Sequence, residues 1–306
     1  MKLNGELAVV TGGAMGMGKS VSRRLLEAGC AVALVDVNAE ALASTAEQLS
    51  RFGTCRPYVC DIADRTAVYA VAETIQADMG AVSILVNNAG IVKAAPLTQL
   101  TDETIEKILK VNLAAPFWTC KAFLPAMIDR NSGHVVNVAS AGGILALPNL
   151  SAYCASKFGV VGLTDALRQE MKKLKANVGF TVVCPNTVGT GMFEGSKMVA
   201  GTRLLDPEDV AADIVAGIRR NKAMVDGLGG ELLDELQVVR VQEAVGFHAE
   251  GKQDCSLILG NLPPLPLLPF GCLVSDGALP LAGGPNVRSR QGVRNNRVSQ
   301  GVLWAA

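Results

Sequence analysis

Six short, mostly apolar runs recur along the first 184 residues, each bounded by a polar or glycine-containing segment. They occupy residues 7–10, 30–35, 56–60, 83–86, 134–138 and 180–184. Continuous apolar runs of this length are typical of parallel strands that are covered on both faces. We therefore predict six buried strands in this part of the chain.

The segments between these runs carry apolar residues three or four positions apart, which is the spacing of amphipathic helices. We predict helices that end near Gly29, cover residues 39–52 and 65–79, carry Asn112, begin near Ser151, and run from Asp206 to about Arg220. Because strands and helices alternate, the sequence predicts an α/β fold. Its core would be a single doubly wound parallel sheet with helices on both faces.

The first predicted strand leads into a glycine-rich loop, Thr11-Gly12-Gly13-Ala14-Met15-Gly16-Met17-Gly18, and then into a helix. Glycines allow the backbone to approach a pyrophosphate, whose negative charge is stabilised at a helix N-terminus. The second predicted strand ends at Asp36, 18 residues beyond Gly18, where a carboxylate can accept hydrogen bonds from both ribose hydroxyls. This order of strand, loop, helix, strand and acid predicts a Rossmann-type dinucleotide site.

Asp36 also bears on which dinucleotide would bind. A carboxylate at the end of the second strand repels a 2′-phosphate, so the sequence favours NAD and makes NADP the weaker candidate. Lys19 and Arg23 or Arg24 would soften this preference if their charges reached the ribose.

A candidate catalytic group lies in Ser151-Ala-Tyr153-Cys-Ala-Ser-Lys157, with Ser140 upstream. In a helix, Tyr153 and Lys157 would share one face about one turn apart. A phenol has an ordinary pKa near ~10, but a neighbouring ammonium stabilises the phenolate and lowers that pKa. Tyr153 would then act as a general acid or base, with Ser140 hydrogen-bonded to the reacting oxygen. Taken alone, a Tyr-x-x-x-Lys pair is more often an ordinary pair on a helix surface.

Over roughly residues 4–225 the sequence resembles the classical short-chain dehydrogenase/reductase family. The motifs that carry the resemblance are Thr11-Gly-x-x-x-Gly16-x-Gly18, Asp61, Asn87-Asn-Ala-Gly90, Asn112, Ser140, Tyr153-x-x-x-Lys157 and Pro185. The resemblance implies a last strand over residues 222–225 and a catalytic tetrad of Asn112, Ser140, Tyr153 and Lys157. In that scheme Tyr153 transfers the proton and Ser140 orients the substrate oxygen. Lys157 binds the nicotinamide ribose and lowers the pKa of Tyr153, and Asn112 holds a water that extends the proton relay.

The same resemblance implies an enzyme that uses NAD(P) to interconvert an alcohol and a carbonyl, with hydride moving between the substrate carbon and the nicotinamide. Its subunits would associate through the helix that carries Asn112 and the helix of residues 153–174, as a homodimer or homotetramer. The implied cofactor-binding residues are Thr11, Gly12, Met15, Gly16, Met17, Gly18, Asp36, Val37, Asp61, Ile62, Asn88, Ala89, Gly90, Tyr153, Lys157, Pro185, Val188 and Thr190.

The segment after Pro185 narrows the resemblance to one branch. The family usually has Gly after this proline, but here Asn186 follows, and the pattern Cys-Pro-Asn-x-x-x-Thr-Gly-Met-Phe-Glu-Gly is similar to retinol and 17-beta-hydroxysteroid dehydrogenases. That branch implies a retinoid, a steroid or a long-chain alcohol as substrate. An apolar lining would suit such a molecule, and its candidates are Ile144, Leu145, Leu147, Leu150, Met192, Phe193 and Met198. The alternatives are a 3-oxoacyl or small-ketone reductase, and a non-catalytic nucleotide-binding scaffold.

Composition argues against several other classes. Lys plus Arg and Asp plus Glu number 28 each, so the formal charge of zero speaks against a nucleic-acid partner. Eight cysteines without C-x-x-C spacing and two histidines, His134 and His248, predict no metal site and suit a reducing compartment. We find no signal peptide and no apolar run of about 18 residues. We therefore expect a cytoplasmic protein without a transmembrane span, with membrane contact left open.

Residues 226–306 depart from the pattern. They contain Leu262-Pro-Pro-Leu-Pro-Leu-Leu-Pro-Phe-Gly271, and their last thirty residues hold four arginines and no acid. This irregular C-terminal tail could be disordered, could contact a partner or an anionic membrane, or could be translated sequence from a misassigned reading frame. We expect disorder or misassignment, with the dinucleotide-binding domain confined to residues 1–225.

Overall fold

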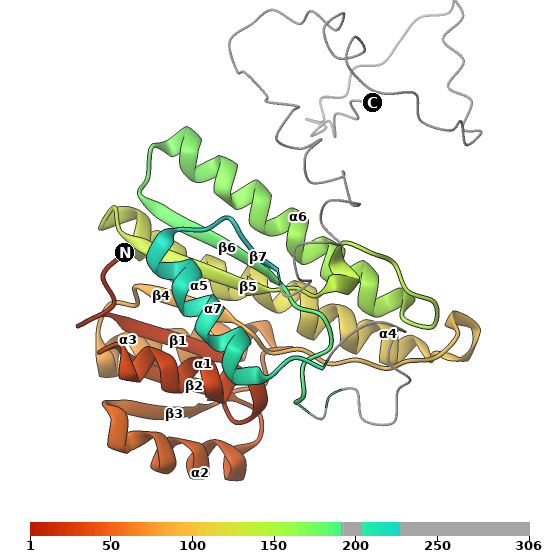
Figure 1. Ribbon diagram of the computed structural model, residues 1–306, viewed down its shortest axis with the longest axis horizontal. Coiled ribbons are helices and arrows are strands. Elements are labelled where there is room, and N and C mark those ends of the chain that lie inside the picture. The colour runs from red at the N-terminus through yellow and green to blue at the C-terminus, as the bar shows by residue number, and fades with distance from the viewer. Residues whose placement is uncertain (191, 193–203, 227–306) are drawn as a thin grey trace, which may run out of the picture. The chain divides into compact units, whose positions relative to one another are not determined.

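A computed structural model describes residues 1–190, 192 and 204–226, and a seven-stranded parallel sheet lies within them (Figure 1). The strand order is β3-β2-β1-β4-β5-β6-β7, so the chain builds outward from β1 in one direction and then in the other. Ligands bind beyond the carboxyl ends of the strands at such a switch point. The strands are β1 (Leu7–Thr11), β2 (Ala31–Asp36), β3 (Cys55–Val59), β4 (Ile84–Asn87), β5 (Gly133–Val138), β6 (Val178–Cys184) and β7 (Met224–Asp226).

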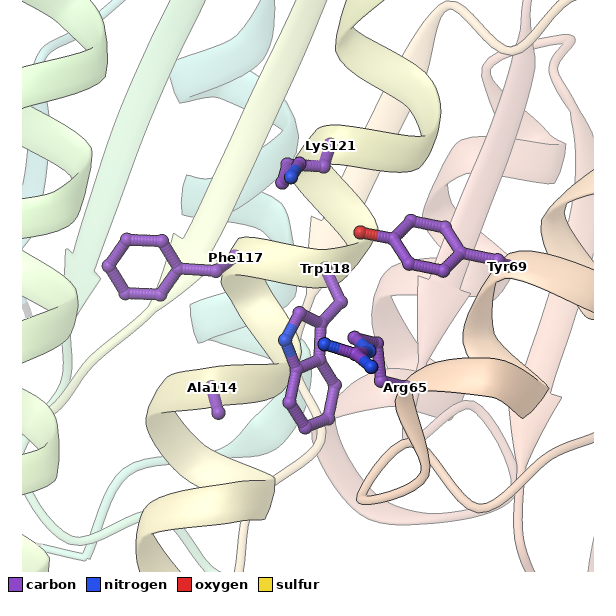
Figure 2. A pocket seen from close by; sticks show the side chains of 6 residues that line it. All are labelled: Arg65, Tyr69, Ala114, Phe117, Trp118 and Lys121. Atoms are coloured by element: carbon purple, nitrogen blue, oxygen red, sulfur yellow. The ribbon is translucent and has the colours of Figure 1, made fainter. Parts of the chain in front are cut away.

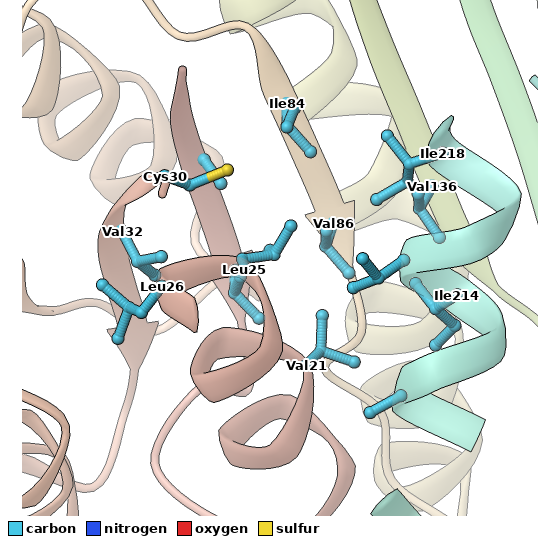
Figure 3. Close-up of a cluster of buried hydrophobic side chains, with 14 of the residues drawn as sticks. Val21, Leu25, Leu26, Cys30, Val32, Ile84, Val86, Val136, Ile214 and Ile218 are labelled. Atoms are coloured by element: carbon cyan, nitrogen blue, oxygen red, sulfur yellow. The ribbon is translucent and has the colours of Figure 1, made fainter. Parts of the chain in front are cut away.

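Helices cover both faces of this sheet, which confirms the predicted doubly wound α/β fold. Ala8 and Val10 of β1 belong to a buried cluster with α1, α2 and α7, and Figure 3 shows the α1 and α7 side chains facing β4. Leu7 and Val9 belong to the cluster on the other face, with α3, α5 and α6, because side chains alternate along a strand. The α-helices are α1 (Gly16–Glu27), α2 (Ala39–Leu49), α3 (Arg65–Met79), α4 (Asp102–Leu109), α5 (Ala115–Asp129), α6 (Ser151–Leu174) and α7 (Pro207–Arg220).

The predicted long helix around Asn112 is not continuous. A π-helical segment, Lys110–Ala114, separates α4 from α5. Pro116 lies in the first turn of α5 and has no N–H to donate to the carbonyl four residues earlier, that of Asn112. The widened turn therefore falls at Asn112, one of the four residues of the implied catalytic tetrad.

Smaller differences concern the ends of elements. The predicted helix over residues 39–52 is α2 followed by a 3₁₀ turn, Ser50–Phe52, and the last strand begins at Met224 rather than at residue 222. The predicted start of α7 is confirmed, and the Asp206 side chain caps this helix by accepting a hydrogen bond from the Glu208 N–H. Within the described ranges no helix is long and apolar enough to cross a membrane. Our predictions for the tail from residue 227 onward lie outside the described residues.

Candidate active site

A cavity of about 720 Å³ opens at the carboxyl ends of the strands, and the glycine loop and helix α6 both line it. Its volume falls in the range of roughly 300–1,000 Å³ that is usual for ligand pockets. Most of the predicted site residues meet here. Those on its wall are Gly12, Met15, Gly16, Met17, Asp36, Val37, Asp61, Ile62, Asn88, Ala89, Gly90, Ser140, Tyr153, Lys157, Pro185, Val188 and Thr190.

The loop between β1 and α1 has the form that a pyrophosphate needs. Helix α1 begins without a side-chain cap and without an acid in its first turn, so its first N–H groups face the cavity side unshielded. A Cβ on Gly12 would lie 2.8 Å from the Ala89 Cα, and one on Gly18 would lie 2.0 Å from the Gly12 carbonyl oxygen. Both positions therefore need glycine for the loop to pack this closely. These features fit a bound dinucleotide.

Thr11 and Gly18 were predicted to contact the cofactor, but they lie behind the cavity wall. The Thr11 hydroxyl accepts hydrogen bonds from the Asn88 and Ala89 N–H groups, each at 3.1 Å. The Asn88 side chain in turn donates to the carbonyls of Thr11 and Gly12. Thr11 thus joins the two loops that form the wall.

Asp36 ends β2 at the cavity, where its carboxylate accepts hydrogen bonds from the Ala14 N–H at 3.1 Å and the Asn38 N–H at 3.0 Å. The cations that could have offset its charge are engaged elsewhere. Lys19 donates to Gln48 at 2.6 Å, and Arg23 and Arg24 both pair with Glu208 of α7.

Tyr153 lies in the first turn of α6, buried, with Ser140 beside it at the end of β5. Burial raises the pKa of Tyr153 above its ordinary value of 10, and a hydrogen bond with Ser140 lowers it in part. The Ser140 hydroxyl also accepts a hydrogen bond from the Gly142 N–H at 3.1 Å, which fixes its direction. The net shift in the pKa of Tyr153 is therefore upward, because burial outweighs the interactions that lower it.

Lys157 is also buried, and its Nζ donates to the Val138 carbonyl at 2.8 Å and lies 5.7 Å from the centre of the Tyr153 ring. Burial lowers the pKa of Lys157 from 10.5 to about 8. The ammonium is thus held beside the cavity by a backbone carbonyl, in an environment that disfavours its charge.

Asn112 does not line the cavity, and its side chain holds the loop after β4. The amide accepts from the Ile91 N–H at 2.8 Å, donates to the Ile91 carbonyl at 2.9 Å, and donates to Ser156 of α6 at 3.1 Å. The π-helical segment therefore ties the Asn88–Gly90 wall to the helix that carries Tyr153.

The arrangement has a counterpart among known proteins. The family model for short chain dehydrogenases matches residues 6–198. The chain belongs to the short-chain dehydrogenase family. It is therefore an NAD(P)-dependent oxidoreductase, as the resemblance implied.

Relatives of this short-chain dehydrogenase include estradiol 17-beta-dehydrogenase 11 of Mus musculus, which is 38% identical over 223 residues, 72% of this chain and 74% of that protein. Epidermal retinol dehydrogenase 2 of Mus musculus is 39% identical over 219 residues, covering 70% and 71% of the two chains. A short chain dehydrogenase/reductase of Burkholderia phymatum, solved in complex with NAD, is 25% identical. It matches with a TM-score of 0.72 over 79% of this chain and 96% of that one.

Sequence reasoning missed part of the wall of the dehydrogenase cavity. Val35, Cys60 and Val138 lie at the ends of strands, so the rule that sites form there could have found them. Lys107 lies in α4 and Val111 lies in the π-helical segment, and neither has a sequence motif beside it that indicates a binding site. Ile144, Leu145, Leu147 and Leu150, predicted to form an apolar lining, are not on the described wall, whereas Met192 is; Phe193 and Met198 lie outside the described residues.

A second cavity, of about 480 Å³, lies between α3 and α5 and is lined by Arg65, Tyr69, Ala114, Phe117, Trp118 and Lys121 (Figure 2). Figure 2 shows the Trp118 ring beside Arg65 and the Phe117 ring pointing away from Tyr69. Phe117 is 46% exposed, and Phe158 on α6 is 45% exposed. Aromatic side chains thus remain uncovered on both of the helices that the resemblance assigns to subunit contacts.

Proposed function

We propose that this short-chain dehydrogenase oxidises a lipophilic alcohol, or reduces the matching carbonyl, with NAD(H). The observation that carries the proposal is the meeting of Ser140, Tyr153 and Lys157 in one cavity with the glycine loop and Asp36. A dinucleotide-binding wall and a positioned proton donor are the two parts that this chemistry needs. The bound nicotinamide would supply the hydride or accept it.

The protein's own part in the reaction is to hold and move a proton. The Tyr153 phenol donates its proton to the carbonyl oxygen in reduction, and the Tyr153 phenolate takes the proton from the alcohol in oxidation. The Ser140 hydroxyl, which is hydrogen-bonded to Tyr153, would donate its hydrogen to the same substrate oxygen once substrate is bound. The Lys157 ammonium stabilises the phenolate once the phenol has given up its proton, because a buried charge of opposite sign is weakly screened there.

Asn112 supports this group indirectly. Its amide fixes Ile91 and Ser156, and the Ser156 hydroxyl donates to the Tyr153 carbonyl at 2.6 Å.

Two observations support NAD over NADP. Asp36 presents a carboxylate at the cavity, and Lys19, Arg23 and Arg24 are each engaged with another side chain. A 2′-phosphate would meet a negative charge without a matching cation from these residues. The lipophilic substrate class rests on the estradiol and retinol dehydrogenases among the relatives, and on the apolar Ile91, Val92 and Met192 of the wall.

The test is turnover of retinol, a 17β-hydroxysteroid and a medium-chain secondary alcohol with NAD and with NADP. We expect oxidation of at least one lipophilic alcohol, with kcat/KM at least about tenfold higher for NAD, since a buried like-charge contact costs several kcal/mol. Asp36→Ala should narrow that ratio. Turnover of small ketones alone would favour the reductase alternative, and NADH binding without any turnover would favour the scaffold.

The uncovered Phe117 and Phe158 support a homodimer or homotetramer formed through α5 and α6. Sedimentation of the wild-type protein should give a mass of two or four chains, and the double change Phe117→Glu with Phe158→Glu should give monomers. Leu97→Glu, at an apolar side chain that is 59% exposed on another segment, serves as the control and should leave the mass unchanged. A wild-type monomer would contradict the proposal.

We also propose that the enzyme works in the cytoplasm. The six described cysteines are all free thiols, which suits a reducing compartment.

A further inference from the structure

Asn186 lies at the end of β6, directly after Pro185, and its side chain lines the cavity. This is the position at which the family usually has glycine, so the side chain adds a polar group that most members lack. The Asn186 side-chain oxygen accepts a hydrogen bond from the Thr187 N–H at 2.8 Å.

That bond fixes which way the amide points. A backbone N–H is a donor, so the atom facing it must be the oxygen, and the NH2 group is directed elsewhere. Asn186 is half-buried, and among the described residues its NH2 group has no hydrogen-bond acceptor. Within the described part of the chain, the Asn186 amide thus keeps two N–H donors that a ligand in the cavity could use.

The backbone around Asn186 is firmly held. The Thr187 carbonyl accepts from the Leu205 N–H at 2.9 Å, and the Gly189 N–H donates to the Leu205 carbonyl at 2.9 Å. On the other side, the Ala141 N–H donates to the Pro185 carbonyl at 2.8 Å. The Asn186 amide therefore belongs to a segment whose backbone is held by hydrogen bonds on both sides.

The last contact places Asn186 close to the reacting centre. β5 and β6 pair with Val138 opposite Val183, and the Ala141–Pro185 bond continues this pairing past the strand ends. Ser140 and Asn186 thus follow the ends of two adjacent strands, and both line the cavity. One substrate bound in this cavity can therefore reach both residues.

We propose that Asn186 is a substrate-positioning residue that donates a hydrogen bond to a second oxygen of the substrate, on a carbon next to the reacting one. This rests on the proposed function, and it narrows the substrate to a lipophilic alcohol with a vicinal hydroxyl or carbonyl oxygen. The reacting oxygen already has Ser140 and Tyr153 as partners, which leaves the Asn186 amide for its neighbour.

The experiment compares 1,2-dodecanediol with 2-dodecanol, which share a chain length and differ in the second oxygen. In the wild type kcat/KM should be higher for the diol. Asn186→Gly and Asn186→Asp should each lose about tenfold on the diol and less than twofold on 2-dodecanol, as expected for one hydrogen bond. Asn186→Asp keeps an acceptor for the Thr187 N–H, so it separates loss of the donor from loss of the local fold.

Two controls make the outcome decisive. The NADH Kd should be unchanged in both variants, and Asn149→Gly, at an exposed asparagine with φ 62° outside the cavity, should change neither substrate. Equal losses on both alcohols, no loss on the diol, or a weaker NADH Kd would overturn the role of Asn186. If the wild type oxidises neither alcohol, the Kd of the diol relative to 2-dodecanol in the NADH complex still decides the inference, and only the proposed function fails.

Discussion

Replacing Tyr153 by phenylalanine is expected to lower kcat by about 10³-fold or more while NADH binding stays within a factor of two. The change removes only the phenol oxygen, and the ring, which is 5% exposed, keeps its packing in α6. General acid–base catalysis by a positioned side chain contributes roughly 10²–10⁴-fold, and here the same oxygen also orients the substrate through Ser140. Steady-state turnover and NADH fluorescence titration measure the two quantities.

Tyr58→Phe provides the matched control. Tyr58 is another buried tyrosine, but its hydroxyl bonds to Asp78 at 3.2 Å, away from the cavity. This variant should retain full turnover. If Tyr153→Phe kept wild-type kcat on a substrate that the wild type oxidises, a phenol-based proton transfer would be excluded.

The pKa of Tyr153 adds a pH signature to this result. Because burial holds that pKa above 10, the side chain is a phenol at neutral pH and is ready to donate a proton. Carbonyl reduction should therefore be favoured near neutrality and alcohol oxidation should rise with pH. A reduction rate that rose with pH would contradict the assignment of Tyr153 as the donor.

Much of the fold could be predicted from the sequence because the strands of a buried parallel sheet have a simple sequence pattern. Strands such as 134–138 are buried on both faces, so their apolar runs need no periodicity to stand out. The glycine loop was equally plain, since Gly12 and Gly18 occupy places where a Cβ would collide with backbone. Because these steric requirements act within short segments, they can be predicted from the local sequence.

What the sequence could not give depends on contacts between distant elements. Three residues of the family motifs lie behind the cavity wall and support it, namely Thr11, Gly18 and Asn112. Only the packing of distant elements separates these supporting residues from those on the wall. The balance at Tyr153 is similar. A spacing of four predicts that Lys157 lies near, but burial of both groups, set by the sheet below and the loops above, outweighs their attraction.

Lys157→Met is expected to abolish turnover and, at the same time, to make the protein more resistant to unfolding. The folded protein lowers the pKa of Lys157 from 10.5 to about 8, so below about pH 8 it carries a buried charge that the unfolded chain would keep in water. At about 1.4 kcal/mol per pKa unit, this shift lowers the free energy of unfolding by roughly 3 kcal/mol. Methionine fills a similar volume without the charge, although the Val138 carbonyl loses its donor, at a cost of about 1 kcal/mol.

The sign of the pH dependence distinguishes this effect from ordinary repacking. A lysine whose folded pKa is depressed destabilises the fold fully below about pH 8, and the penalty fades as pH rises from about 8 toward 10.5. The variant's advantage in urea unfolding should therefore be about 2 kcal/mol at pH 7 and should shrink at pH 9.5. Lys121→Met, at an exposed lysine of α5, should shift stability by less than about 0.5 kcal/mol. A Lys157→Met protein that was less stable than the wild type at pH 7 would mean that the ammonium stabilises the fold. The expected result would mean that the buried charge lowers the stability of the fold and is retained because catalysis needs it.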